Sequence, residues 1–316
     1  MRRAPSAVVT VTGALMCVVL TSACEAMVYG DTGPRPRSVP SLSAQTAGVP
    51  GPAQTAGVPA MADAPTVVSE AALDGLGTRV AQATAEAAQD GADISVVVHD
   101  RVTDQTVSSG NSTAIATASV AKLFIADDVL YQASTGQTQL SPDDGQALDL
   151  MLQSSDDSAG ELFWDRGGGQ AITTRVAARY GLVSLTAPYD GRWWNTMITA
   201  DDLVRYYDML LDGTGGLPAA KAGIIVDNLS QATPEGIDGY PQRFGIPDGL
   251  FAEPVAVKQG WMCCWNGDNW MHLSTGVIGP DRRYVMVIGS LQPSDDATAR
   301  TTITEAVKTM FPAGRI

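Results

Sequence analysis

The segment from Glu25 to Thr66 limits how much of this chain can fold. It contains seven prolines and a repeated stretch, Ala44–Pro50 recurring as Ala53–Pro59, and it has no apolar periodicity. Such a composition does not bury enough surface to order a chain, so we expect a proline-rich tether over residues 24–66. The remainder, residues 67–316, is long enough for one large domain with its own core.

The first 24 residues have the pattern of a secretory signal. Arg2 and Arg3 precede an apolar stretch that ends at Leu20, and small residues then lead to Cys24. The stretch is shorter than the roughly 20 residues that a membrane-spanning helix needs. The pattern resembles a bacterial lipobox. We therefore expect a signal peptide over residues 1–23, acylation of Cys24 with fatty acids such as palmitate, and a lipid-anchored protein on the extracytoplasmic face of the cell membrane. Ordinary secretion is the alternative.

Charge and cysteine content narrow the possible partners. The net charge of −14 argues against nucleic acid, because phosphate binding needs a basic surface. After loss of Cys17 with the signal and acylation of Cys24, Cys263 and Cys264 remain, so no disulfide framework is expected. The two adjacent residues either close on each other or stay as thiols on opposite sides of a strand.

The folded part begins and ends with mixed elements and has a helical middle. Periodicity predicts a helix from Ser69-Glu70 to about Asp90-Gly91, a strand over 94–99 and a short second strand after a polar turn. Caps and apolar spacing then predict helices that start at Ser119, at Ser141-Pro142, at Gln170 (to Tyr180) and at Ala200 (to Leu211). Strands over 254–258, 271–278 and 284–289 and a helix over 295–310 follow. This order predicts an α+β fold in which both chain ends form one antiparallel sheet packed with helices, with an inserted all-helical lobe.

Lysine usage is the strongest clue to chemistry. The chain has only four lysines, and one of them follows Ser119 by three residues in Ser119-Val120-Ala121-Lys122. Residues three apart share one face of a helix, so Lys122 can draw the proton from the Ser119 hydroxyl. Arginine stays protonated in proteins and cannot replace it. The alternative for Ser119 is an ordinary helix N-cap.

Two further motifs follow in order, Ser155-Asp156-Asp157 and Lys258-Gln259-Gly260. The three together resemble the signatures of penicillin-binding proteins and class A β-lactamases, the superfamily of serine acyltransferases with an S-x-x-K motif. The chain also resembles alanine-rich lipoproteins of actinobacteria. The resemblance spans nearly the whole folded region.

The resemblance implies a role for each motif residue. Ser119 is the nucleophile, Lys122 takes its proton, Ser155 relays the proton to the leaving group, and Lys258 attracts a substrate carboxylate. The implied substrate-binding positions are Asp157, Gln259, Gly260 and Trp261, with backbone N–H groups of Ser119 and Trp261 as oxyanion donors. The expected partners are peptidoglycan or a β-lactam-like small molecule, with no cofactor, no metal and a monomeric protein.

The chain also departs from this family. Asp157 stands where the family has asparagine, and its carboxylate would favour protonated Lys122 and make it a poorer base. Gln259 replaces a threonine or serine. If Asn195 matches the asparagine of the class A loop, the deacylating glutamate falls at Gly191, and Asp190 beside it is short. We therefore predict a slow or degenerate acyl hydrolase or transferase. The alternative is a catalytically inactive protein that binds cell-wall material.

Other residue types give weaker leads. His99 and His272 lie in strand-like segments without a nucleophile-elbow pattern, so we interpret them as structural histidines. The histidines and cysteines have no zinc-binding spacing. Five tryptophans lie near the motif segments, either as a stacking platform or, the interpretation we favour, as core and rim packing: Trp193, Trp194, Trp261, Trp265 and Trp270.

Overall fold

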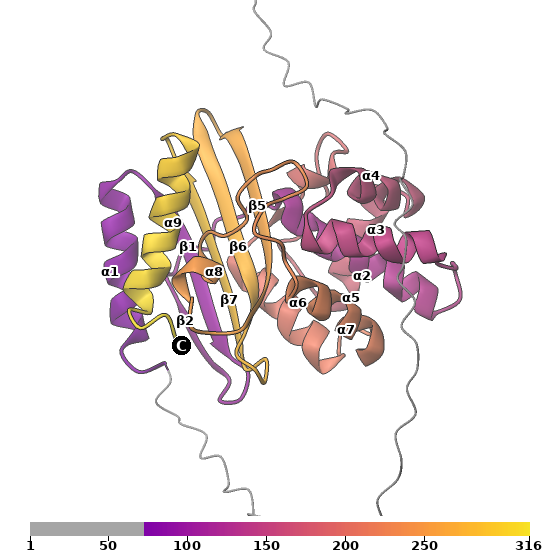
Figure 1. Cartoon of the computed structure of the whole chain (residues 1–316), viewed down its shortest axis with the longest axis horizontal. Coiled ribbons are helices and arrows are strands. Elements are labelled where there is room, and N and C mark those ends of the chain that lie inside the picture. Colours follow the sequence, from indigo (N-terminus) through magenta and orange to yellow (C-terminus); the bar gives the residue numbers. More distant parts are fainter. Residues whose placement is uncertain (1–72) are drawn as a thin grey trace, which may run out of the picture. The chain divides into compact units, whose positions relative to one another are not determined.

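A computed structural model describes residues 73–316, and the predicted signal peptide, Cys24 and most of the tether lie outside them. The centre is a five-stranded antiparallel sheet in the order β2-β1-β7-β6-β5 (Figure 1). Its strands are β1 (Asp93–Asp100), β2 (Gln105–Ser108), β5 (Val255–Trp265), β6 (Asn269–Ile278) and β7 (Tyr284–Gln292). Because β1 pairs with β7, the two ends of the described chain share one sheet, as predicted.

Both faces of the sheet are buried. Along β1, Val96 and Val98 join one core cluster while Val97 joins the other, since successive side chains of a strand point to opposite faces. This explains why the strand is apolar almost throughout. Helices α1 (Leu76–Gln89) and α9 (Asp296–Met310) lie side by side on one face, with the short α8 (Ile246–Gly249) nearby (Figure 1).

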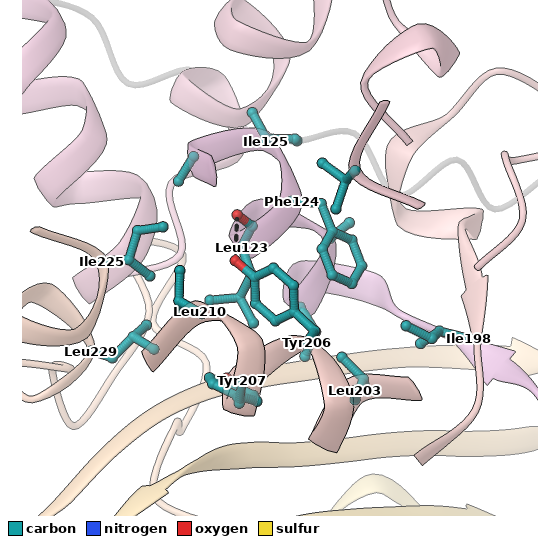
Figure 2. Close-up of a cluster of buried hydrophobic side chains, with 14 of the residues drawn as sticks. Leu123, Phe124, Ile125, Ile198, Leu203, Tyr206, Tyr207, Leu210, Ile225 and Leu229 are labelled. Atoms are coloured by element: carbon teal, nitrogen blue, oxygen red, sulfur yellow. Dashed lines mark hydrogen bonds between the residues drawn. The ribbon is translucent and has the colours of Figure 1, made fainter. Parts of the chain in front are cut away.

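A helical lobe covers the other face. It consists of α2 (Ala121–Ser134), α3 (Pro142–Gln153), α4 (Asp157–Arg166), α5 (Gln170–Tyr180), α6 (Ala200–Asp212) and α7 (Ala219–Leu229). Leu123 and Phe124 of α2 pack against Tyr206 of α6 (Figure 2), whose hydroxyl donates a hydrogen bond to the Leu123 carbonyl at 3.4 Å. The prediction of an inserted helical lobe is confirmed. A two-stranded ribbon, β3 (Ile115–Ala116) with β4 (Met197–Ile198), borders it.

Helix α2 is buried on every side, and two of its carboxylates need partners there. Arg175 of α5 binds Asp128 with two nitrogens, at 2.8 and 2.7 Å, and Arg179 and Tyr180 bind Asp127. Burial raises the pKa of Asp127, and the Arg179 guanidinium opposes this. These bonds fix α2, and with it the position of Lys122, against α5.

Several predicted boundaries differ from the structure. Helix α1 begins at Leu76, after Gly75 in the left-handed region (φ 70°), so the prediction that it already includes Leu73 is wrong. Strand β5 does not end at the Lys258 motif but continues to Trp265, because Trp261 and Met262 still pair with β6. Helices α4 and α7 were not predicted. Within residues 73–316 no helix is long and apolar enough to span a membrane.

Candidate active site

Ser119 lies in a short 3₁₀ turn, Ala118–Val120, that leads directly into α2. The preceding Ala118 has a φ of 43°, in the left-handed region that costs free energy for a residue with a Cβ atom. The turn packs tightly on β5. A Cβ atom at Gly260 would lie 2.4 Å from the Thr117 carbonyl oxygen, so only glycine allows this approach.

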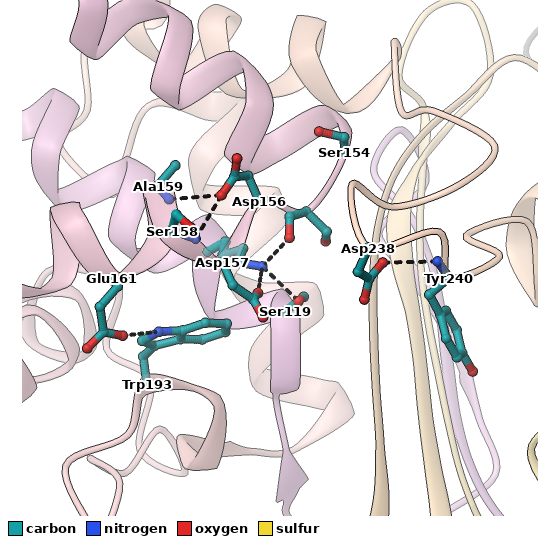
Figure 3. A network of polar contacts seen from close by, with 12 residues as sticks. Ser119, Ser154, Asp156, Asp157, Ser158, Ala159, Glu161, Trp193, Asp238 and Tyr240 are labelled. Carbon is teal, nitrogen blue, oxygen red and sulfur yellow. Dashed lines mark hydrogen bonds and ion pairs between the residues drawn. The ribbon is translucent and has the colours of Figure 1, made fainter. Parts of the chain in front are cut away.

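Lys122 connects the first two motifs. Its Nζ lies 2.9 Å from Ser119 Oγ, 2.7 Å from the Ser155 carbonyl oxygen and 2.5 Å from Asp157 Oδ1 (Figure 3). The ammonium also lies 4.7 Å from the Trp193 ring centroid. A Cβ atom at Gly160 of α4 would approach Lys122 Cε to 3.2 Å, so glycine leaves room for this side chain.

Lys258 connects the second and third motifs. It lies on the lobe-facing side of β5 and donates a hydrogen bond to Ser155 Oγ. Ser155 has a left-handed φ of 58°, so its carbonyl oxygen reaches Lys122 while its hydroxyl reaches Lys258. The Ser119, Lys122, Ser155 and Lys258 side chains are all buried or nearly so, and we call these four residues the floor of the site.

Burial lowers the pKa of both lysines. For Lys122, loss of water outweighs the carboxylates of Asp157, Asp156 and Asp238, which act in the opposite direction. For Lys258, burial lowers the pKa well below its ordinary value, and the charge of Lys122 lowers it further. A lowered pKa favours the neutral amine, the form that accepts a proton. As expected, the Asp157 carboxylate raises the pKa of Lys122, but burial lowers this pKa by more.

A cavity of about 460 Å³ opens above the floor, within the size range of small-molecule sites. Ser119 lines it, together with four aromatic residues and two carboxylates that we call the walls: Tyr189, Trp194, Trp261, Trp265, Asp157 and Asp238. The buried Trp193 also contributes, and its indole N–H donates to Glu161 at 3.0 Å (Figure 3). Of the five tryptophans singled out in the sequence, four line this cavity.

Gln259 does not join the site through its side chain. It lies on the opposite face of β5 from Lys258 and is only 2% exposed. Its amide donates to the carbonyl oxygens of Gln242 and Phe244, at 2.9 and 2.7 Å. The structure thus brings Ser119, Lys122, Ser155, Asp157, Lys258, Gly260 and Trp261 together and leaves the Gln259 amide elsewhere.

The loop before β4 places Asn195 in the cavity wall. The Asn195 amide donates to Asp190 Oδ2 at 2.8 Å, and Arg192 lies 3.8 Å from the same carboxylate oxygen. Gly191 carries no side chain in this loop. The carboxylate of Asp190 is thus held by Asn195 and Arg192.

Cys263 and Cys264 lie at the rim, where β5 has an irregular register against β6. Their Sγ atoms are 3.0 Å apart, well beyond the ~2.05 Å of a disulfide bond. The sequence left two alternatives, a disulfide or two thiols on opposite sides of a strand. The structure matches neither in full, because the two sulfurs are not bonded but are in contact.

The histidines are structural, as interpreted from the sequence. His99 bonds Thr106 at 2.9 Å between β1 and β2, and His272 Nε2 bonds the Tyr240 hydroxyl at 2.7 Å. Neither lines the Ser119 cavity. Within the described part of the chain, no group of three potential ligands gathers at a metal-binding spacing.

Sequence reasoning missed Asp238 and Tyr189. Asp238 lies in the loop before α8 and faces the floor across the cavity (Figure 3). No motif marks either residue, since each stands in a loop next to glycine and proline. Only the fold reveals that these loops border the site.

Comparisons with known proteins identify relatives of this chain. No family model matches it. A protein of Mycobacterium tuberculosis (strain H37Rv), named "Putative lipoprotein LppW", is 69% identical over 241 residues, which cover 76% of each chain, and its counterpart in Mycobacterium bovis matches equally.

Solved structures share the fold at low identity. A β-lactamase from Chitinophaga pinensis matches with a TM-score of 0.62 at 15% identity, over 77% of this chain and 100% of that one. The penicillin-binding protein PBP-A matches with a TM-score of 0.62 at 17% identity, over 76% and 96%. The chain therefore belongs to the LppW lipoprotein family and has the fold of class A β-lactamases and penicillin-binding proteins.

Proposed function

We propose that this protein is a serine acyl hydrolase or transferase of the penicillin-binding or β-lactamase-like type. The observation that carries the proposal is the 2.9 Å contact between Lys122 Nζ and Ser119 Oγ at the base of an open cavity. A serine with an ordinary capping role does not require a buried lysine with a lowered pKa beside it.

The reaction follows from these contacts. Ser119 Oγ forms a bond to the substrate carbonyl carbon while its proton passes to neutral Lys122, and the carbonyl oxygen becomes an oxyanion. The proton on Lys122 then passes to the leaving nitrogen or oxygen. Relay through the Ser155 hydroxyl requires that hydroxyl to turn from Lys258 toward Lys122, which contacts the Ser155 carbonyl oxygen in the structure. The bond from the carbonyl carbon to the leaving atom breaks, which leaves an ester on Ser119.

Slow release of this ester follows from the Asn195 loop. The Asp190 carboxylate is held by Asn195 and Arg192, and Glu161 accepts a hydrogen bond from Trp193. Neither acid is among the residues that line the cavity, so neither is positioned to activate water there, and loss of a positioned base typically costs a factor of about 10²–10⁴.

A labelling experiment tests the enzyme. We expect purified protein to acquire a covalent label from a fluorescent penicillin or from an uncharged fluorescent fluorophosphonate, with no label on Ser119→Ala and only slow colour change of a chromogenic cephalosporin. Rapid cephalosporin turnover would overturn the slow-release proposal. Label that persists in Ser119→Ala would overturn the role of Ser119.

The second candidate is an inactive protein that binds cell-wall material. Two observations favour it: the ion pair that holds Lys122 to Asp157, and the Gln259 amide that is turned to the other face of the sheet. This candidate predicts pull-down with peptidoglycan that is equal for wild type and Ser119→Ala, together with no covalent label on either protein.

The LppW family supports an anchored protein. We propose that Cys24 carries the lipid and holds the folded domain outside the cell membrane through the residue 24–66 tether. Cys24→Ser is expected to move the protein from the detergent phase to the aqueous phase in detergent partition and to abolish labelling with palmitate. Unchanged partition would contradict the anchor.

A further inference from the structure

We infer that the cavity above Ser119 selects an organic cation: an amide or ester that carries a free ammonium group next to a planar or apolar portion. Binding of such a cation depends on the wall residues alone. The statement that such a molecule is the acyl donor rests on the proposed function.

The charged residues of the walls are both acidic. Asp157 and Asp238 line the cavity, and no lysine or arginine is among the residues that line it. The side chain of Asp157 is 77% exposed and Asp238 is also exposed, so both carboxylates meet an entering ligand. A carboxylate at the mouth attracts a cation and repels an anion.

The two lysines of the floor do not cancel this charge. Lys122 lies 2.5 Å from Asp157: as an ammonium it balances that carboxylate and no more, and as the neutral base of the proposed reaction it leaves the charge of the carboxylate in place. Lys258 is fully buried, and its closest partners are the Ser155 hydroxyl and the Gln259 carbonyl oxygen. Burial and the charge of Lys122 both lower its pKa and thus disfavour its ammonium form.

Asp238 acts on both lysines from a distance but is paired directly with neither. Its Oδ1 accepts the Tyr240 backbone N–H at 3.0 Å, which fixes the carboxylate without neutralising it. Within residues 73–316 no cationic side chain forms an ion pair with Asp238. Arg192, in the Asn195 loop, lies 3.8 Å from the Asp190 carboxylate instead.

The aromatic walls supply the second half of a cation site. Tyr189, Trp194, Trp261 and Trp265 line the same cavity, and indole and phenol faces attract cations. Trp261 is held in place by stacking on Tyr240, with ring centroids 4.3 Å apart and planes 5° apart. The Arg192 guanidinium already lies 5.6 Å from the Trp194 ring, so a ligand cation is expected at the other rings of the walls.

Asp238 and Trp261 are neighbours. Both approach Gly236: a Cβ atom there would lie 2.6 Å from Asp238 Oδ1 and 3.6 Å from Trp261 Cη2, so the carboxylate and the edge of the indole lie close together. Both residues also line the cavity, and an ammonium that enters it on this side approaches a carboxylate and an aromatic side chain. Gln259, implied by the resemblance as a substrate-binding residue, keeps its amide on the other face of β5, so beside the buried Lys258 it offers no contact to a substrate carboxylate.

Binding of non-acylating probes tests the inference without catalysis. Phenethyltrimethylammonium, its uncharged tert-butyl analogue and 3-phenylpropionate are titrated against wild type and Ser119→Ala, with tryptophan fluorescence as readout. We expect the cation to bind about tenfold more tightly than the uncharged analogue, with the carboxylate weakest. Equal binding of cation and uncharged analogue, tighter binding of the carboxylate, or no binding by any probe would overturn the inference.

Matched variants locate the effect. Asp238→Asn is expected to reduce cation affinity about threefold and leave the uncharged probe unchanged. Asp149→Asn, the same charge change at an exposed position of α3, is the control and is expected to change neither. A reduction that is equal in both variants would show general surface electrostatics and contradict the site.

A substrate pair then separates this inference from the proposed function. Phenylalanine p-nitroanilide carries a free ammonium, and its N-succinyl derivative carries a carboxylate instead. Faster acylation by the first, judged by release of p-nitroaniline, supports both proposals. Cation-selective binding without acylation by either compound refutes the statement that such a molecule is the acyl donor and keeps the binding site, while the Ser119 labelling test decides the enzyme separately. Faster acylation by the succinyl compound keeps the enzyme and refutes the cation preference.

Discussion

The floor and the walls of the Ser119 cavity follow the family pattern to different degrees. The floor residues Ser119, Lys122, Ser155 and Lys258 are buried and joined by hydrogen bonds, and each matches a motif position. The walls carry Asp157, Asp238 and large aromatic residues, and the Gln259 side chain is directed elsewhere. The floor is built into the core between α2 and β5, whereas the walls stand on loops and on the edge strand.

The difference separates chemistry from recognition. Replacement of a floor residue leaves a buried polar group without its partner, which costs free energy, so its geometry is tied to the stability of the fold. Replacement of a wall residue mainly changes what enters, because loops tolerate substitution. The account therefore predicts an acylation apparatus in working order beneath altered substrate recognition.

The largest effect is expected from Lys122→Met, which keeps the volume of the side chain and removes the base. Covalent labelling of Ser119 should slow by about 10²–10⁴-fold, because proton transfer from the hydroxyl is lost. Lys308→Met on α9 is the control and should label at the wild-type rate. Normal labelling of the Lys122 variant would show that the floor does not act as proposed.

Acid should lower the stability of the folded protein through His272, which lies beside the wall residue Trp261. His272 pairs with Trp261 across β5 and β6, and burial lowers the pKa of His272 from 6.5 to about 4. Between these values the unfolded chain takes up a proton here and the folded chain does not. The free energy of unfolding should therefore fall as the pH drops from 6.5 to about 4, by about 3 kcal/mol in all. Urea unfolding at a series of pH values measures this.

The His272→Gln variant tests the cause. Glutamine still reaches the Tyr240 hydroxyl but does not titrate in this range, so its stability should change less between pH 6.5 and 4 than that of wild type. The same pH slope in both proteins would assign the acid sensitivity to other groups.

A smaller effect is expected where floor and sheet meet. Gly260→Ala places a methyl group 2.4 Å from the Thr117 carbonyl oxygen, so the Ser119 turn must shift. We expect a loss of about 1–3 kcal/mol in unfolding free energy and slower labelling. Gly223→Ala in α7, where a Cβ atom meets nothing within 4 Å, should be neutral or stabilising by up to about 1 kcal/mol. Equal effects of both changes would contradict the close packing of this turn on β5.

The smallest effect is expected from Asp157→Asn, at the border of floor and walls. The carboxylate raises the pKa of Lys122, so its removal should favour the neutral amine. Because Asp157 is largely exposed, we expect only about threefold faster labelling near neutral pH, and a pH profile displaced to lower pH. Loss of labelling would instead show that the Asp157 carboxylate is needed to position Lys122.

The elements that the sequence predicted best have explicit end signals. Helix α5 was predicted from Gln170 to Tyr180 because Gly181 stops it, and α3 starts at its Ser141 capping box. Helix α4 was missed because Asp157 was interpreted only as part of a motif, although Asp156 caps a helix there. The end of β5 was misplaced since Trp261–Trp265 has no apolar alternation and is held by pairing with β6.

The residues of the site were likewise predicted where the sequence carries a specific signal and missed where it does not. Ser119, Lys122 and Lys258 were found because lysine is rare and the spacing is specific, and the structure brings them together around Ser155. Asp238 was not found, because its place in the site depends on how the loop before α8 folds back over β5. The direction of the Gln259 amide depends on strand alternation relative to the sheet, which a motif does not state.

Intact-protein mass spectrometry shows whether Ser119 is the nucleophile. The protein is incubated with a penicillin and, separately, with an uncharged serine-directed fluorophosphonate, and the modified residue is located by peptide mapping. The account predicts a single adduct on Ser119 with at least one reagent, absent from Ser119→Ala. No adduct on Ser119 with either reagent would contradict it.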